Sequence, residues 1–334
     1  MNYLIKSLKN FKLKRLFDII DRCHKICGKN KVFLFFDMVM CTFLYKSGYA
    51  DYEFLEMYRL KRKDRKKLVT VGKNDKLVKE LNPNEYWKLV DDKVLFNDRF
   101  KDFLGRDYMK LNDDNLSEFE KFVKDKKQIM VKPIADTWGN GIEKIDLKGK
   151  DIKKLYKKLV KNKQLLVEGI ASQHKDISKI HPDSINTIRV VSVRNKYGVV
   201  TIIGAVIRMG TGHNVVDNFH NGGIYAPIDI ETGKINGEAT NKKEEKITIH
   251  PTTGVKLIGY QLPCWDEVLK TTIKAHNMIP ELGYIGWDAF VNKEGKVGFI
   301  EANQYPGHVL YKQMKMKDGS DILPLFEEAL EKRK

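Results

Sequence analysis

The chain has 334 residues, 42% of them hydrophobic and 10% aromatic, and a formal net charge of +17 at pH 7. This composition excludes a disordered tail and allows one large domain or two to three small ones. Four cysteines in a chain without a secretory signal exclude a disulfide framework, so we expect reduced thiols and a cytoplasmic protein.

The first residues of the chain combine apolar and basic side chains. Residues 1–28 place Leu4, Leu8 and Ile19 at helical spacing among lysines, which predicts a basic amphipathic helix. Such a helix either packs on its own domain or lies on a membrane surface. We therefore keep peripheral contact of residues 1–30 with an anionic membrane as an alternative to simple packing.

Positive charge is concentrated in the first third of the chain. Residues 1–110 carry 26 Lys and Arg against 15 Asp and Glu, which suits nucleic acid, an anionic membrane or a polyanionic substrate, and equally a solvated surface. Helical character continues through residue 69, and the run "LKRKDRKK" at 60–67 forms its polar end. This run has no interleaved aromatic residues, so we expect a solvated charge run and no nucleic-acid partner.

Two features near the start of the chain have simple structural interpretations. The apolar run "VFLFFDMVMCTFL" at 32–44 has about 13 residues and contains Asp37, whereas a spanning helix needs about 20 apolar residues. We predict a buried helix there. Cys23, His24 and Cys27 lack a second pair of ligands at metal-site spacing, so we expect buried helical cysteines and no metal.

From about residue 90 the pattern changes to alternating strands and helices. We expect strands at 128–134 and 164–170, a helix from about 151, a hairpin at 186–210 around "NKYG", a helix at 264–279, a hairpin at 284–303 around "NKEG", and a closing helix at 321–333. Because the strands pair as hairpins, an α+β fold with antiparallel sheets is favoured over a parallel sheet. We divide the chain into a helical region at 1–90 and a catalytic domain at 91–334, with a lobe boundary near 168–172.

The run "GFIEANQYPG" at 298–307 carries the strongest chemical signal. Side chains alternate along a strand, so Glu301 and Asn303 point to the same side. In the preceding strand Asp288 should lie roughly opposite Glu301, with the turn between them near 292–296. Adjacent carboxylates repel unless a cation lies between them, and this set of hard oxygen ligands suits Mg²⁺.

A Mg²⁺ site of this kind implies a nucleotide, and several residues are suited to bind phosphate. Lys132 lies inside the apolar strand "IMVKPI" and needs a fixed partner. The loop "DTWGNG" at 136–141 follows it, and its backbone N–H groups can approach phosphate oxygens, although an ordinary turn has the same composition. Arg189 and Arg208 lie on the two arms of a hairpin, where they either stabilise a transferred phosphoryl group or form a cross-strand salt bridge.

Together these residues resemble the ATP-grasp superfamily, whose carboxy-terminal signature is a strand aspartate followed by Glu-x-Asn-x-x-Pro-Gly. More closely, the chain resembles the sugar-transfer-associated ATP-grasp proteins found among polysaccharide-building genes, over about residues 30–310. The motifs that carry this resemblance are "GYADYEF", "DDKVLF", "VEGIASQHKDISKIHPDSINTIRVVSV", "VDNFHNGGIYAPID" and "GWDAF". The resemblance implies two α+β lobes with antiparallel sheets that grip ATP, preceded by the basic helical region.

Transferred to this chain, the family's roles fall on four groups of residues. The metal ligands would be Asp288, Glu301 and Asn303, which hold Mg²⁺ between the β- and γ-phosphates. The ATP-binding residues would be Lys93, Lys132, Thr137, Gly139, Asn140, Gly141, Glu168 and Ile170. The catalytic cations would be Arg189 and Arg208, beside the γ-phosphate and then an acyl phosphate, and Asn218, Gly222 and Gly223 would shape the acceptor side.

The resemblance implies an ATP- and Mg²⁺-dependent ligase that joins an amine to a carboxylate, with a sugar carboxylate as the expected substrate class in cell-surface polysaccharide synthesis. Two alternatives remain: a small-molecule kinase on the same fold, and a basic membrane- or polyanion-binding module with a vestigial ATP site. The loop "WGNG" has fewer glycines than many family loops, and the helical region differs from the family's usual α/β substrate domain. Acceptor binding is therefore not transferred from those ligases.

Overall fold

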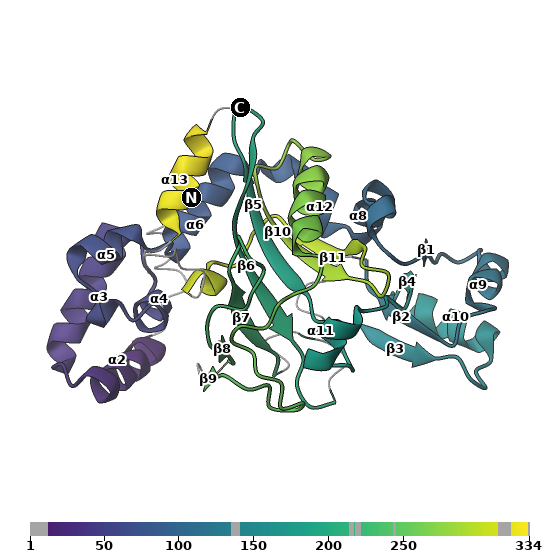
Figure 1. The fold of residues 1–334 in the computed structure, drawn as a ribbon, viewed down its shortest axis with the longest axis horizontal. Coiled ribbons are helices and arrows are strands. Elements are labelled where there is room, and N and C mark those ends of the chain that lie inside the picture. The colour runs from purple at the N-terminus through teal and green to yellow at the C-terminus, as the bar shows by residue number, and fades with distance from the viewer. Residues whose placement is uncertain are drawn as a thin grey trace.

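The computed structural model describes residues 13–134, 141–213, 217, 222–242, 245–312 and 322–332. The described chain begins with helices that start at the left of Figure 1 and reach α8, right of its centre and towards the small lobe. These helices are α2 (Leu13–Cys27), α3 (Lys31–Tyr45), α4 (Tyr49–Phe54), α5 (Arg62–Lys67), α6 (Val71–Leu81), α7 (Lys88–Asp91) and α8 (Lys93–Arg99). No helix within these ranges is long and apolar enough to cross a membrane.

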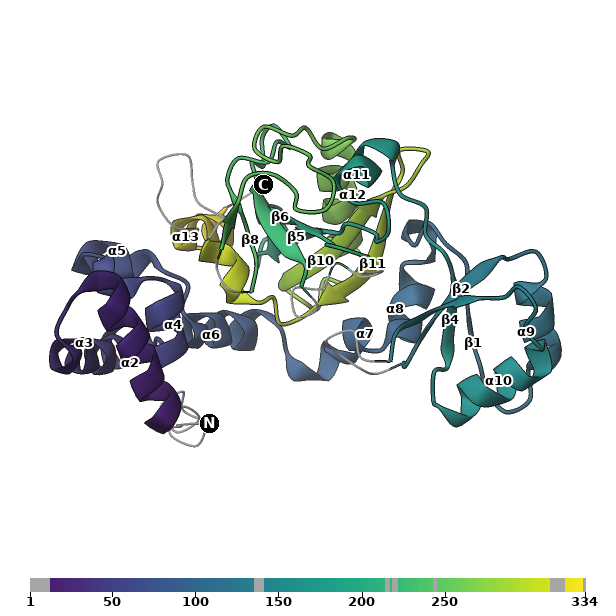
Figure 2. The same cartoon turned by 90° about the horizontal axis from the view of Figure 1, so that it is seen from below.

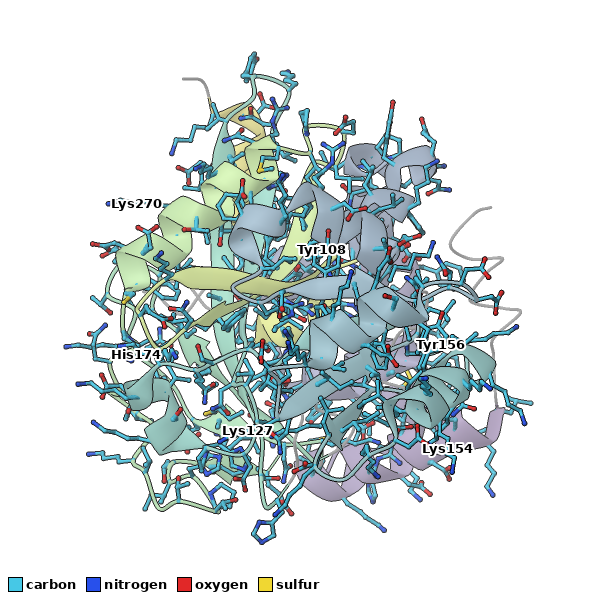
Figure 3. The ribbon with its side chains drawn as sticks, turned by 90° about the vertical axis from the view of Figure 1, so that its right-hand side faces the viewer. Tyr108, Lys127, Lys154, Tyr156, His174 and Lys270 are labelled. Carbon is cyan, nitrogen blue, oxygen red and sulfur yellow. The ribbon has the colours of Figure 1, made fainter. Side chains whose placement is uncertain are left out.

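A small lobe follows, at the right of Figures 1 and 2. Its four described strands are antiparallel, in the order β1-β4-β2-β3, and α9 and α10 cover one face. The bounds are β1 (Tyr108–Lys110), α9 (Leu116–Val123), β2 (Gln128–Lys132), β3 (Glu143–Asp146), α10 (Ile152–Lys161) and β4 (Leu166–Gly169). Figure 3 looks onto this lobe from its end, with Lys154 and Tyr156 on α10.

The larger sheet has seven described strands, all antiparallel, in the order β11-β10-β5-β6-β7-β8-β9. Its strands are β5 (Ile188–Arg194), β6 (Val200–Met209), β7 (Ile224–Ile228), β8 (Ala239–Thr240), β9 (Lys246–Ile247), β10 (Tyr284–Val291) and β11 (Val297–Asn303). The helices of this part are α11 (Lys175–Ile180), α12 (Trp265–Asn277) and α13 (Leu323–Glu331).

Alternation along the central strands supplies two cores. Val190 and Trp287 pack on the side of α12, whereas Val191 and Tyr284 pack with α6 and α13 on the other side. Arg189 and Asp288 each lie two or four residues along a strand from members of the second set, so they belong to that face. Arg189 and Asp288 therefore lie on the same face of the sheet as the core formed with α6 and α13.

The predicted α+β class and antiparallel hairpins are confirmed. β5 and β6 flank "NKYG", and β10 and β11 flank "NKEG". The predicted continuous helix through residue 69 is wrong, because α4 ends at Phe54 and Glu56 adopts a left-handed backbone with φ of 48°. Helix α5 is a separate element, and Arg65 within it is held in an ion pair with Asp37.

The prediction of a buried helix at 32–44 is half right. Helix α3 buries one face in a core shared with α2 and α4. Its opposite face is apolar and exposed. The hydrophobic run did not reveal this, because a run of apolar residues does not tell how many other elements pack against the helix. Cys23 is buried in the same core, where burial raises the pKa of its thiol to about 12, as suits a structural cysteine.

Candidate active site

The predicted pairing of the two carboxylates is present. Asp288 on β10 lies directly opposite Glu301 on β11. Asn303 lies on the same side as Glu301, and its Nδ2 approaches Glu301 Oε1 at 3.5 Å. A short turn between two long apolar strands fixes this register, so three oxygen-bearing side chains gather at one end of the sheet.

Two arginines from the neighbouring hairpin bind Asp288. Arg189, which pairs with Asp288 across β5 and β10, donates Nε to Oδ1 at 2.5 Å and Nη2 to Oδ2 at 3.0 Å. Arg208 on β6 donates Nη2 to Oδ2 at 2.7 Å. Burial would raise the pKa of Asp288, but the two guanidinium groups outweigh burial and hold that pKa well below its usual range.

Glu301 is in a different electrostatic position. Among the described residues, no Lys, Arg or His lies within ion-pair distance of its carboxylate. Burial and the charge of Asp288 raise the pKa of Glu301, although Arg208 and Arg189 partly oppose this. A half-buried carboxylate without an adjacent cation favours the binding of one, and Glu301 with Asn303 offers the oxygen ligands that Mg²⁺ prefers.

Arg189 and Arg208 form the cross-strand salt bridge that the sequence left open as an alternative, so guanidinium groups already provide cations beside Asp288. The described residues contain no cluster of three or more His, Cys, Asp or Glu suited to a metal. A metal at this position would therefore have two carboxylates and one amide from the protein, with Asp288 shared between the metal and the arginines. This set fits Mg²⁺, which completes its octahedron with water or substrate oxygens.

The small lobe brings a second buried cluster to the site. Lys132 at the end of β2 pairs with Glu168 on β4, with Nζ and Oε2 2.6 Å apart. Met130 is the direct partner of Glu168, so Lys132 reaches it diagonally across the strands. Burial lowers the pKa of Lys132, and Lys132 is close enough to Glu301 for their charges to interact. The two sheets thus approach one another at these side chains.

Arg106, which the sequence reasoning missed, connects the two sheets. Its Nη2 donates to Glu168 Oε1 at 2.8 Å, and its Nη1 donates to the carbonyl of Phe299 on β11 at 2.9 Å. Asn97 on α8 donates to the same Glu168 oxygen at 3.0 Å. Burial would raise the pKa of Glu168, but Arg106 and Lys132 outweigh it and lower that pKa. No local pattern marks Arg106, because its partners are distant in sequence.

Three of the other expected ATP-binding residues, Lys93, Gly141 and Ile170, lie in described segments. Lys93 begins α8, and its backbone N–H donates to the carbonyl of Ile134, two residues before the predicted phosphate loop. Ile170 follows β4 and is 39% exposed. Gly141 has a φ of +68°, and a Cβ there would lie 2.9 Å from Pro133 Cγ, so glycine is required at this turn. Thr137, Gly139 and Asn140 lie outside the described residues.

On the proposed acceptor side, Gly222 and Gly223 lead directly into β7, which pairs with the Arg208 strand. Asn218 is outside the described residues. Its neighbour Asp217, which the sequence reasoning missed, accepts from Thr187 N at 2.8 Å and from Thr187 Oγ1 at 2.5 Å. Burial raises the pKa of Asp217, and the Asp217 charge helps to raise the pKa of Arg208.

The end of the β10–β11 hairpin is held by residues from the front of the chain. His308 Nε2 lies 2.8 Å from Asp51 Oδ1, so His308 is held in a pair with α4. Asn82 donates to the carbonyls of Tyr284 and Gln304, both at 2.6 Å, and accepts from Tyr284 N at 2.9 Å. These bonds fix the segment that follows Asn303.

A family model described as sugar-transfer-associated ATP-grasp matches residues 72–323 of the chain. None of the curated proteins is similar enough in sequence to be matched.

Several solved structures of ligases are similar to this chain. The D-alanine–D-alanine ligase from Coxiella burnetii is 13% identical over 66% of this chain and 49% of its own, with a TM-score of 0.40. The ATP-grasp ligase PsnB, complexed with minimal precursor, is 13% identical over 75% of this chain and 63% of its own, with a TM-score of 0.44. The L-amino acid ligase from Bacillus licheniformis is 13% identical over 73% and 48%, with a TM-score of 0.44. The chain thus spans less than two thirds of the length of each of these proteins.

Proposed function

Because the chain belongs to the sugar-transfer-associated ATP-grasp family, we propose that it is an ATP- and Mg²⁺-dependent ligase that joins a carboxylate to an amine. One observation carries the proposal. Glu301 is a half-buried carboxylate without an adjacent described cation, and its charge interacts with two arginines of its own sheet and with Lys132 of the other sheet. Such an arrangement suits a polyphosphate and its metal.

The proposed metal ligands are Asp288, Glu301 and Asn303. Mg²⁺ bound there would neutralise phosphate charge and hold the phosphate oxygens in position. Two features of the side chains support this role. Glu301 and Asn303 lie on one side of β11, and the two arginines lower the pKa of Asp288 and so favour its charged form.

The nucleotide would lie between the two sheets. Lys93 and Lys132 would contact phosphate oxygens, and Glu168 with the backbone at Ile170 would contact the adenine edge. The loop residues proposed to cover the phosphates are Thr137, Gly139, Asn140 and Gly141. Lys132 is paired with Glu168 in the structure, so this proposal requires Lys132 to exchange part of that pair for phosphate. We place the catalytic domain at residues 91–334, with its lobes meeting near 168–172.

In the proposed reaction, the acceptor carboxylate attacks the γ-phosphorus of ATP and ADP leaves. The resulting acyl phosphate is attacked by an amine, and inorganic phosphate leaves as the amide forms. Arg189 and Arg208 would stabilise negative charge on the transferred group, because they already converge at Asp288. The protein contributes mainly position and charge, and no nucleophilic side chain is required.

We infer that the substrates are small molecules, with a carboxylated sugar and an amino acid or other amine as the expected pair in cell-surface polysaccharide synthesis. Asn218, Gly222 and Gly223 would shape the acceptor side. Thr187 donates its backbone N–H to the buried carboxylate of Asp217 and accepts a hydrogen bond from Arg208 Nε. These contacts would hold the Arg208 side chain in an orientation that faces the substrate.

Calorimetry of ATP binding tests the proposal, with and without Mg²⁺, on the wild type and Asn303→Ala. Tight binding that requires Mg²⁺ and is weakened by Asn303→Ala is the expected result. Carboxylate and amine mixtures are then screened for ADP release, and mass spectrometry distinguishes an amide with inorganic phosphate from a stable phosphorylated product, which would indicate a kinase. Absence of ATP binding by the folded wild type would overturn both enzyme functions.

A further inference from the structure

Helix α3 is apolar around most of its circumference, yet only one face is buried. Leu34, Met38, Cys41 and Tyr45 pack in the core that α3 shares with α2 and α4. The opposite face exposes large apolar side chains that are each between 49% and 64% accessible. This exposed face consists of Val32, Phe33, Phe36, Met40, Phe43 and Leu44.

These side chains form one continuous stripe because they recur at intervals of three and four residues. A surface helix of a globular protein usually carries polar residues on its outer face, and contiguous apolar patches mark sites of interaction. Helix α3 lies at the far left of Figures 1 and 2, at the end of the molecule opposite the small lobe. The stripe is therefore remote from the candidate active site.

A basic helix borders this stripe. Arg65 on α5 donates Nη1 to Asp37 Oδ1 at 2.7 Å and Nη2 to Asp37 Oδ2 at 2.8 Å, which fixes α5 beside α3. Asp37 is four residues after Phe33 and three before Met40, so α5 is anchored at the edge of the apolar face. The exposed basic side chains of this segment are Lys61, Arg62, Lys63, Lys66 and Lys67.

We propose that the exposed face of α3, together with α5, binds the surface of an anionic lipid bilayer. An apolar stripe flanked by lysines and arginines is the chemistry by which helices lie in the interface of a charged membrane. With 15 residues α3 is about 22 Å long, shorter than the bilayer core of about 30 Å, so the helix would lie in the membrane plane.

Charge favours a lipid surface over a second copy of the chain. Residues 13–68 contain 14 Lys and Arg against 7 Asp and Glu, a net charge of +7. Two copies meeting through α3 would bring two such regions together, and like charges oppose that contact. An anionic bilayer supplies both the apolar phase for the phenylalanines and the negative charge for α5. The inference concerns α3 and α5 and does not depend on the proposed ligase activity.

Vesicle flotation of the full chain tests the proposal, with phosphatidylcholine vesicles alone and with phosphatidylglycerol added. The wild type is expected to float only with the anionic vesicles, and less at high salt. The double variant Phe36→Asp with Phe43→Asp is expected to bind at least about tenfold more weakly. Lys63→Glu with Lys66→Glu should also weaken binding. Ile249→Asp, at a position 56% exposed in the larger sheet region, is the matched control and should bind like the wild type.

Circular dichroism of each variant and of the milder pair Phe36→Ser with Phe43→Ser verifies that the altered chains remain folded. Failure of the folded wild type to bind anionic vesicles would overturn the proposal, as would unchanged binding by both phenylalanine pairs. Sedimentation velocity provides the remaining outcome. Self-association that the phenylalanine variants abolish, without any vesicle binding, would assign the face to a contact between copies and reject the lipid surface.

Discussion

Asp288 and Glu301 are direct cross-strand partners, yet the structure shifts their pKa values in opposite directions. Asp288 is bound by two guanidinium groups, and Glu301 has no described cation at ion-pair distance. Two carboxyl groups that face each other across β10 and β11 thus have different environments, because Arg189 and Arg208 of the neighbouring hairpin bind only Asp288 of the two. This asymmetry leaves Asp288 with arginines beside it and Glu301 without a cation of its own, although both are proposed metal ligands.

Asp288→Asn should lower the free energy of unfolding by about 3–5 kcal/mol, because it leaves the buried Arg189 and the half-buried Arg208 without their counterion. Urea unfolding measures this difference. Asp176→Asn is the matched control, since Asp176 pairs with Lys179 at the surface and its loss should produce no measurable change. If both substitutions change the free energy of unfolding by a similarly small amount, the ion pairs of Asp288 with Arg189 and Arg208 do not stabilise the fold as proposed.

Glu301→Gln should have the opposite effect on stability. In the absence of nucleotide it removes a half-buried carboxylate that lacks a described counterion, so the free energy of unfolding should rise by about 1 kcal/mol. The same variant should lose the thermal stabilisation that ATP with Mg²⁺ gives to the wild type. Differential scanning fluorimetry measures both quantities. A destabilisation as large as that of Asp288→Asn would refute this assignment.

Arg106→Met should destabilise the protein by about 3 kcal/mol, because it removes one cation from Glu168 and the donor to the Phe299 carbonyl. Lys132 still neutralises part of the Glu168 charge, so the loss should fall at the lower end for buried pairs. Urea unfolding is again the measurement. Arg59→Met, in an exposed contact of 4.0 Å with Glu56, is the control and should resemble the wild type.

His276 should make stability depend on pH. It is buried and neutral, with Nε2 donating to the Leu282 carbonyl at 2.8 Å and Nδ1 accepting from Ser192 Oγ at 2.7 Å. Burial, with a smaller contribution from Arg194, lowers the pKa of His276 to about 4 from the ordinary 6.5. Between these values the unfolded chain binds a proton that the folded chain does not, so stability is lost as pH falls through this window.

The pH-dependent contribution of His276 is about 3 kcal/mol, present in full above pH 6.5 and lost towards pH 4. His276→Gln should therefore show a smaller fall in the free energy of unfolding over this range than the wild type. Urea unfolding of both proteins at several pH values gives the difference. Parallel pH profiles would rule out this role.

Asn82→Ala should lower the free energy of unfolding by about 3 kcal/mol. The substitution leaves two carbonyls and the N–H of Tyr284 without the bonds that Asn82 supplies, and buried polar groups without partners are costly. Asn277→Ala, on the exposed surface of α12, is the control and should have little effect. If Asn82→Ala behaves like the control, the C-terminal end of α6 does not hold the β10–β11 hairpin.

The sequence predicted most reliably what neighbouring residues determine. The hairpin 284–303 and the opposition of Asp288 and Glu301 follow from strand alternation and a short turn, and both were predicted correctly. The partners of Arg65 and Arg106 were not foreseeable, because Asp37 and Glu168 lie far from them in sequence. Hydrophobicity located α3 but could not tell which of its faces would find packing partners.

Helix α6 has a consequence for the order of events during synthesis. Asn74 donates to the carbonyl of Pro306, 232 residues later, and Asn82 donates to the carbonyl of Gln304, 222 residues later. At about 10 residues per second the ribosome takes roughly 20 s to supply these acceptors. Until then the side-chain amides of Asn74 in α6 and of Asn82 at its end lack these acceptors. The contacts of α6 with the β10–β11 hairpin therefore form only after residues 304–306 have been synthesised.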